Sequence, residues 1–137
     1  MNGVTCGVWL ARRARGLVAV AVDEDGRPLA QKVFDRDRDA QWDLLTWIDT
    51  EVGLDCDLVL PDELARDCEL AHFAVERGAA VWLVPPIVLR CVRIVANLDT
   101  GPPARTAAAL ARVPLAPMLR QYLCRLVPPQ KPRQLLV

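Results

Sequence analysis

Apolar and polar positions alternate loosely over the first quarter of the chain, in runs of strand length. Residues 4–11 and 17–22 form two such runs, and 27–34 forms a third. An Asp-Gly step at 25–26 separates the second run from the third, and glycine accepts the positive φ that a tight hairpin turn demands. The pattern therefore predicts three consecutive antiparallel strands over 4–11, 17–22 and 27–34.

Helical spacing replaces this alternation after residue 38. Asp39 is a candidate N-cap, and Gly53 is a candidate helix end. Between them an apolar stripe recurs at helical intervals, formed by Trp42, Leu45, Ile48 and Val52. The short apolar run 58–60, closed by Pro61, predicts a buried strand.

The middle of the chain repeats this succession of helix and strand. A second helix is expected from Asp62 or Glu63 to Gly78, and it places apolar residues at helical intervals. The wholly apolar run 79–84 predicts a parallel strand that is covered on both faces. Strands that alternate with helices in this way indicate parallel crossovers.

The last third is richer in proline and less regular. We expect helices over 87–96, 106–112 and 114–126, a loop over 97–103, and a tail over 127–137. The predicted order β-β-β-α-β-α-β-α is ribonuclease-H-like. It describes one α/β domain over 1–126, in which three antiparallel strands lead into βαβ crossovers, giving a mixed five-stranded sheet with flanking helices.

Composition favours a cytoplasmic protein. There is no stretch of 18 apolar residues and no secretory leader, so we expect neither secretion nor membrane association. Five cysteines without a C-x-x-C pair, beside the single His72, argue against a disulfide framework and against a zinc site. We expect these cysteines to be buried as small hydrophobic side chains, and we expect no bound metal.

Charge is distributed unevenly along a chain whose net charge is zero. Residues 1–76 carry 16 acidic and 8 basic side chains, whereas residues 77–137 carry 1 acidic and 9 basic side chains. Such a split indicates a surface for nucleic acid or for another partner near the C-terminal end. The alternative is that the two halves face one another and neutralise each other in the fold.

The opening of the chain resembles a known family. The segments Gly7–Ala11 (GVWLA), Leu17–Gly26 and Pro28–Ala30 are similar to the first strands of the DEDD transposases of bacterial insertion sequences. The alanine-rich segment Ala107–Arg112 resembles a later helix of the same family, and the similarity covers about residues 3–113. The resemblance implies a ribonuclease-H-like domain, related in fold to Holliday-junction resolvases, of mobile-element origin.

The chain departs from this family at the residues that would perform catalysis. Trp9 stands at the position of the first catalytic aspartate, while Asp62 or Glu63 falls near the second acidic position. Asp99 is the acid of the third region, and Arg105 or Thr106 replaces the aspartate expected before the alanine-rich helix. Two-metal phosphodiester cleavage needs several carboxylates that converge on two Mg²⁺ ions, and an indole cannot bind a metal. We therefore expect a degenerate site without a cofactor, in which Mg²⁺ would be required only if the acids were rearranged.

Other side chains offer weaker candidates for chemistry. Cys68 and His72 have the spacing of one helix face, but no acid orients them, so we expect core packing rather than a nucleophile pair. We expect the tryptophans at 42, 47 and 82 to lie in the core rather than to stack on bases.

Three hypotheses for the function follow. The leading one is a non-catalytic domain that binds a protein partner or a second copy of itself. The second is a nucleic-acid-binding module that uses basic side chains to hold phosphates, chiefly Arg12, Arg13, Arg15, Arg105 and Arg112, with Arg90, Arg93, Arg120 and Arg125 in support. The third is a metal-dependent nuclease with a rearranged site at Asp62, Glu63 and Asp99.

Overall fold

Six strands form one sheet in the described residues of the computed structural model, which are 4–11, 16–53, 55–98 and 101–127. The strand order is β3-β2-β1-β4-β5-β6. The strands β1 (Thr5–Ala11), β2 (Gly16–Val22) and β3 (Pro28–Phe34) are antiparallel neighbours, which confirms the prediction for this part of the chain.

The hairpin between β2 and β3 has the predicted turn chemistry. Gly26 adopts a φ of 80°, and the Asp23 backbone N–H donates to the Arg27 carbonyl at 2.9 Å. The Asp23 carboxylate also accepts hydrogen bonds from the backbone of Asp25 and Arg27, each at 2.9 Å. The turn therefore satisfies its own polar groups, as aspartate turns commonly do.

The other half of the sheet is parallel until its last strand. The strands β4 (Asp57–Pro61) and β5 (Val81–Val84) run parallel to β1, as predicted. A sixth strand, β6 (Cys124–Leu126), pairs antiparallel with β5 at the sheet edge. The five-stranded prediction is wrong by this strand, because residues 124–126 were expected to be helical.

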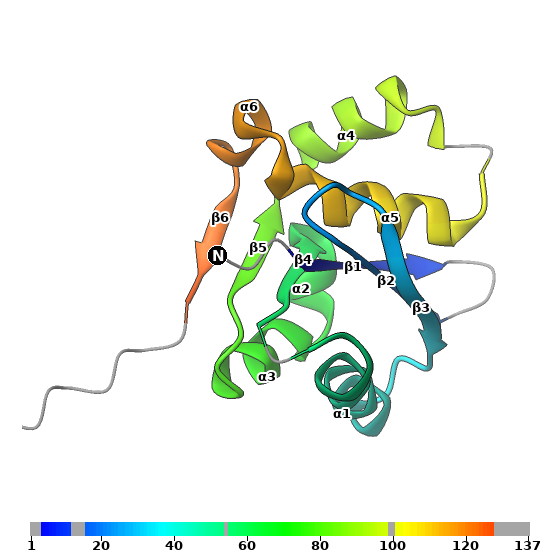
Figure 1. Cartoon of the computed structure of the whole chain (residues 1–137), viewed down its shortest axis with the longest axis vertical. Helices are drawn as coiled ribbons and strands as arrows, with labels where there is room; N and C mark the ends of the chain where they lie inside the picture. The colour runs from blue at the N-terminus through cyan, green and yellow to red at the C-terminus, as the bar shows by residue number, and fades with distance from the viewer. Residues whose placement is uncertain (1–3, 12–15, 54, 99–100, 128–137) are drawn as a thin grey trace, which may run out of the picture.

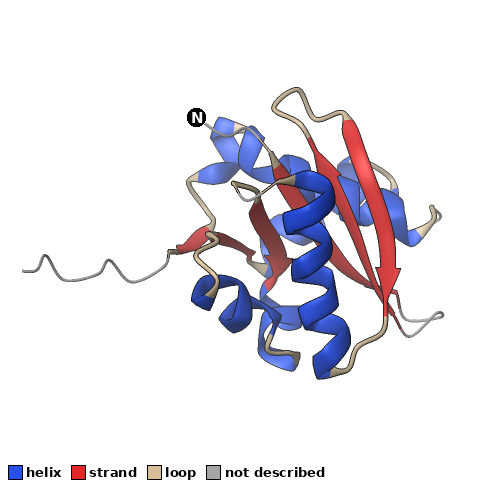
Figure 2. Cartoon of the chain, turned by 60° about the horizontal axis from the view of Figure 1, so that its bottom comes forward, coloured by secondary structure: helices blue, strands red, loops and turns tan. Residues whose placement is uncertain are grey.

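One face of the sheet is covered by α1 (Arg38–Trp47), α2 (Asp62–Asp67) and α3 (Leu70–Glu76), as Figure 1 and Figure 2 show. The N-cap of α1 is Asp37 rather than the predicted Asp39, because the Asp37 carboxylate accepts a hydrogen bond from the Ala40 N–H at 2.7 Å.

The ends of these helices explain two further differences from the prediction. The first helix continues as the π-helical turn η1 (Ile48–Val52) before it ends at Gly53, as expected. The single helix expected over 62–78 is instead broken between α2 and α3, where Cys68 is extended. Gln41 of α1 lies at this break, and its side-chain oxygen accepts a hydrogen bond from the Glu69 N–H at 3.0 Å.

The opposite face is covered by α4 (Pro86–Val95), α5 (Pro103–Arg112) and α6 (Pro117–Arg120). The first two confirm the helices predicted there. The helix expected over 114–126 is wrong, since the chain forms the 3₁₀ turn η3 (Val113–Leu115), then α6 and then β6. Within the described residues no helix has the length and apolarity needed to span a membrane.

The inner strands β1, β2 and β4 are covered on both faces, which explains why they are almost wholly apolar. Leu17 of β2 packs into the cluster beneath α1 and α3, while its neighbour Val18 packs against the alanines of α5. The backbone of α5 approaches β1 so closely that a Cβ at Gly7 would lie 2.6 Å from the Ala111 nitrogen. Only glycine accommodates this approach without displacement of the helix.

Candidate functional site

The strands β1 and β4 separate at their carboxyl ends, which is the edge where open α/β sheets bind their ligands. Their pairing runs from Thr5–Asp57 to Gly7–Val59. Beyond it lies a hollow of about 120 Å³, lined by Trp9, Leu10, Pro61, Glu63, Leu64 and Asp67. The structure therefore brings Trp9 and Glu63, two of the predicted site residues, to the same hollow.

Trp9 is half-buried and joins two parts of the core. Its ring packs against the α5 alanine cluster and also against the valine cluster beneath α4. The Arg93 guanidinium of α4 lies over the indole, with its Cζ atom 5.5 Å from the ring centroid. The indole therefore fills the space between β1 and α4. Its ring face contacts the Arg93 guanidinium, and it offers no oxygen atom that could bind a metal.

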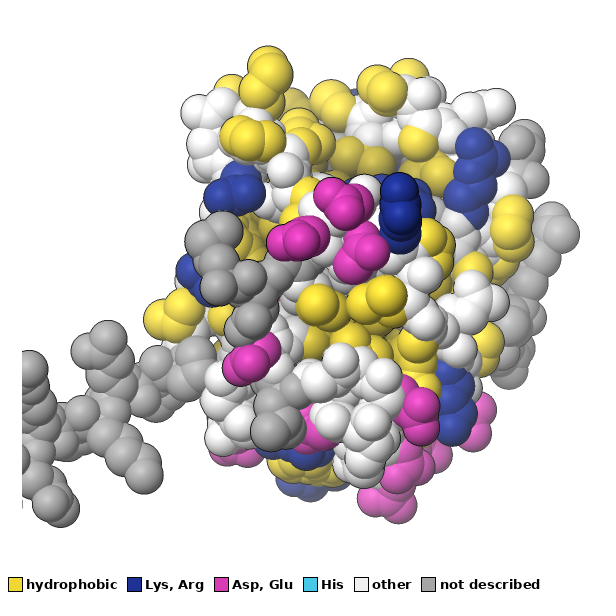
Figure 3. All heavy atoms as spheres, in the orientation of Figure 1, with side chains coloured by type: hydrophobic (Ala, Val, Ile, Leu, Met, Phe, Trp, Pro, Cys, Tyr) yellow, Lys and Arg dark blue, Asp and Glu magenta, His cyan; other side chains and the backbone are white. Residues whose placement is uncertain are grey.

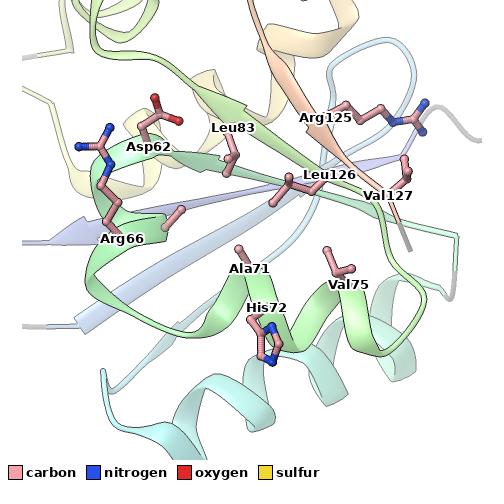
Figure 4. A pocket seen from close by; sticks show the side chains of 10 residues that line it. Asp62, Arg66, Ala71, His72, Val75, Leu83, Arg125, Leu126 and Val127 are labelled. Atoms are coloured by element: carbon pink, nitrogen blue, oxygen red, sulfur yellow. The ribbon is translucent and has the colours of Figure 1, made fainter. Parts of the chain in front are cut away.

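The two candidate acids at the end of β4 diverge. Asp62 and Glu63 are the first two residues of α2, where negative side chains favour the positive end of a helix. Glu63 is exposed and lines the small hollow, whereas Asp62 is half-buried and lines a separate groove of about 660 Å³. Figure 4 shows Asp62 at one end of that groove, near Arg66, with Arg125 at the other end.

This arrangement does not fit two Mg²⁺ ions. Within residues 4–11, 16–53, 55–98 and 101–127, no three His, Cys, Asp or Glu side chains gather closely enough to hold a metal. Two-metal cleavage requires carboxylates that converge on both ions, but Trp9 offers none and the two α2 acids open onto different hollows. The fourth candidate, Asp99, lies outside the described residues.

The basic residues predicted to hold phosphates divide into two groups. Arg105 and Arg112 are exposed on α5 and are seven residues apart, so they share one helix face. Arg105 donates to the Ala96 carbonyl at 3.0 Å, and Arg112 donates to the Gly26 carbonyl at 2.8 Å. Each hydrogen bond uses one of the five N–H groups of a guanidinium. Both side chains therefore link α5 to a neighbouring loop, and each guanidinium has further N–H groups that can donate to a phosphate. The second group, Arg12, Arg13 and Arg15, lies outside the described residues.

Charge separates between the two helical layers. The helical segments α1, η1, α2 and α3 carry eight acidic and two basic residues, whereas α4, α5 and α6 carry five arginines and no acidic residue. Arg77 and Arg125 form ion pairs with Asp49 and Asp57, which join the two halves of the chain. Both pairs lie outside α4–α6, so the layers retain opposite charge on opposite faces of the sheet.

The Cys68 and His72 pair is not formed. Cys68 lies in the break between two helices, is half-buried, and donates from Sγ to the Leu64 carbonyl at 3.2 Å. Burial raises the pKa of its thiol, which opposes a nucleophilic role. His72 is exposed and pairs with Glu76 at 3.1 Å, so the expectation that it packs in the core is wrong.

The remaining cysteines follow the prediction only in part. Cys6 and Cys56 are buried in the core. Burial raises the pKa of the Cys56 thiol to about 12, and it also raises the pKa of the Cys6 thiol. Cys91 and Cys124 are exposed, contrary to expectation.

A polar cluster beneath β6 was not predicted. The Trp82 indole donates to the Asp57 carboxylate at 3.1 Å, and the Arg125 guanidinium lies 3.4 Å from the same oxygen. The Arg125 Cζ atom lies 4.9 Å from the Trp82 ring centroid. Only β6 brings Arg125 to this place, and a helix over 114–126 would not have done so.

No family model matches the chain, and a search of the curated proteins finds no significant match.

Proposed function

We propose that the chain is a non-catalytic ribonuclease-H-like domain, derived from a mobile-element transposase, that acts by binding a protein partner or a second copy of itself. The strand order supports this proposal. Three antiparallel strands are followed by two parallel strands, and the parallel strands are reached through helices. This is the arrangement that the resemblance to DEDD transposases implies.

The residues around Trp9 support the proposal that the domain is non-catalytic. The resemblance implies a metal-binding aspartate at this position on the first strand, which would hold the metal from the centre of the sheet. The indole is instead packed between two core clusters and covered by Arg93. A metal ion there would meet apolar carbon and a guanidinium, and both raise the free energy of a dication.

Calorimetric titration with Mg²⁺ tests this part directly. The chain, freed of metal by a chelator, should give only heats of dilution, because the described acids do not converge. Glu63→Gln is the matched variant, since Glu63 is exposed and its replacement should leave the fold intact. Stoichiometric Mg²⁺ binding by the unchanged chain that disappears in Glu63→Gln would contradict the proposal.

A second candidate function, binding of nucleic acid, is favoured by the five arginines of α4–α6. Fluorescence anisotropy with single-stranded, duplex and four-way-junction DNA at about 50 and 200 mM salt tests it, because counterion release makes phosphate-driven affinity fall steeply with salt. Arg112→Gln should lower the slope of log affinity against log salt by about one if Arg112 contacts phosphate, and Arg112→Lys should retain the slope. Affinity that does not change with salt would exclude this function.

A further inference from the structure

The outward face of α4 is apolar where a surface helix is ordinarily polar. Ile87, Arg90, Cys91 and Ile94 follow one another at i, i+3, i+4 and i+7, so they share one face, and all four are exposed. Ile87 is 72% exposed and Ile94 is 70% exposed. The opposite face of the helix, by contrast, places Val88 in the core.

The apolar surface extends from α4 to α6. Val95 is 86% exposed, Met118 is 80% exposed and Tyr122, just after α6, is 62% exposed. The inner sides of both helices pack into one core cluster, and Figure 1 shows α6 beside the N-terminal end of α4. Figure 3 shows hydrophobic side chains along the upper rim, where Figure 1 places α6 and α4. We call this surface the α4–α6 face, formed by Ile87, Ile94, Val95, Met118 and Tyr122.

A shallow groove along α4 adds positive charge to this surface. It has a volume of about 330 Å³ and is lined by Pro86, Leu89, Arg90, Arg93 and Ile94. Apolar side chains and two guanidinium groups therefore lie side by side. Such a groove suits a partner that presents an apolar stripe flanked by carboxylates.

The charge of this surface discriminates between possible occupants. The described residues from 86 to 127 include six arginines and no aspartate or glutamate. In a two-fold dimer built through this face, the same patch contacts itself, so Arg90 of one copy would approach Arg90 of the other and their like charges would repel. A protein partner that supplies carboxylates avoids this repulsion. The phosphate backbone of a nucleic acid would also attract the arginines, but it would leave Ile87 and Ile94 without an apolar contact.

We propose that the α4–α6 face binds an amphipathic helix of a partner protein, with an apolar stripe that lies on Ile87 and Ile94 and flanking acidic residues that contact Arg90. This inference rests on the proposed binding function and names the chemistry of its partner. The ten residues of α4 span about 15 Å, which matches three turns of a docked helix.

Two synthetic peptides of about 18 residues test the proposal, a length at which an isolated helix can form. Both carry leucine at helical spacing, and their polar positions are glutamate in one and lysine in the other. Anisotropy of the labelled peptides, titrated with the whole chain at about 150 mM salt, should show the glutamate peptide binding at least about tenfold more tightly.

Substitutions then locate the binding surface. Ile94→Glu should weaken the glutamate peptide by about tenfold or more, because it removes apolar contact and adds a like charge. Val33→Glu is the matched control, since Val33 is 60% exposed on β3, far from this face, and should bind as the unchanged chain does. Far-UV circular dichroism would verify that both variants fold.

Several results would overturn the inference. Equal affinity for the two peptides would refute the charge preference, and an unchanged affinity in Ile94→Glu would refute the location. A dimer in sedimentation velocity that Ile94→Glu dissociates would assign the face to a second copy, and DNA binding lost in Ile94→Glu would assign it to nucleic acid. None of these results depends on Mg²⁺ binding. The peptide experiments can therefore refute the proposed partner while the Mg²⁺ titration still supports a non-catalytic domain.

Discussion

Replacement of Gly7 by alanine should destabilise the fold, because α5 packs its backbone directly on this residue. The new Cβ would lie 2.6 Å from the Ala111 nitrogen and closer still to the Ala107 carbonyl oxygen. Both neighbours are backbone atoms of fully buried residues, so no side-chain rotation can relieve the overlap. Overpacking costs about 1–3 kcal/mol, and rigid backbone contact on two sides places this variant near the upper end.

Part of this loss is offset in the unfolded chain. Alanine lowers the conformational entropy of the unfolded state, which contributes about 0.4–1 kcal/mol of stability. We therefore expect a net loss of about 2 kcal/mol, a large share of a stability that is ordinarily about 5–15 kcal/mol. The melting temperature should fall by roughly 10 °C.

Urea unfolding followed by far-UV circular dichroism measures this loss, with the slope against urea expected to stay constant. Gly101→Ala is the matched control, because a Cβ there meets only the flexible Arg105 side chain, at 3.0 Å. The control should lie within about 0.5 kcal/mol of the unchanged chain. A Gly7→Ala variant as stable as this control would refute the close packing of α5 on β1.

A double-mutant cycle of Arg93→Ala and Trp9→Leu, which removes the aromatic face, should give a coupling energy of about 0.5–1 kcal/mol in urea unfolding, and additive effects would show that the two groups do not interact. At pH 8 a thiol reagent should modify Cys91 and Cys124 quickly and Cys56 only on unfolding; rapid labelling of Cys56 would contradict its burial. Because burial raises the pKa of the Cys56 thiol from 9.0 to about 12, the unfolded thiol ionises first. The free energy of unfolding should therefore fall as pH rises between these values, and no fall would count against the raised pKa.

The parts of the fold that the sequence predicts correctly are those with local causes. The first three strands follow from apolar runs and from the turn chemistry of Asp25 and Gly26, which involves only neighbouring residues. The break before α3 was missed because its cause is a side chain 28 positions away, where Gln41 accepts a hydrogen bond from Glu69. No local window contains that contact.

The sixth strand was missed for the same physical reason. Its three residues are exposed, and the alternation Cys-Arg-Leu is too short to predict a strand by itself. They form a strand because they pair with β5 and because Arg125 reaches Trp82 and Asp57. Such pairing depends on the sheet that is already in place, which the isolated segment does not encode.

The candidate site was predictable in its residues but not in its contacts. The position of Trp9 on the first strand follows from the alternation, and Asp62 and Glu63 follow Pro61 as expected. The divergence of these two acids depends on how the first turn of α2 is oriented. Likewise, Arg93 covers Trp9 only because α4 packs on the core cluster that Trp9 also contacts, at a sequence separation of more than eighty residues.

A cleavage assay shows whether the domain retains nuclease activity. Labelled duplex and four-way-junction DNA would be incubated with the chain and with Mg²⁺ or Mn²⁺, the ions that oxygen-ligand sites prefer. The absence of a metal-binding carboxylate at Trp9 predicts that the DNA remains as intact as in a protein-free control. Metal-dependent cleavage that is lost in Asp99→Ala would contradict this account and would establish a rearranged nuclease site.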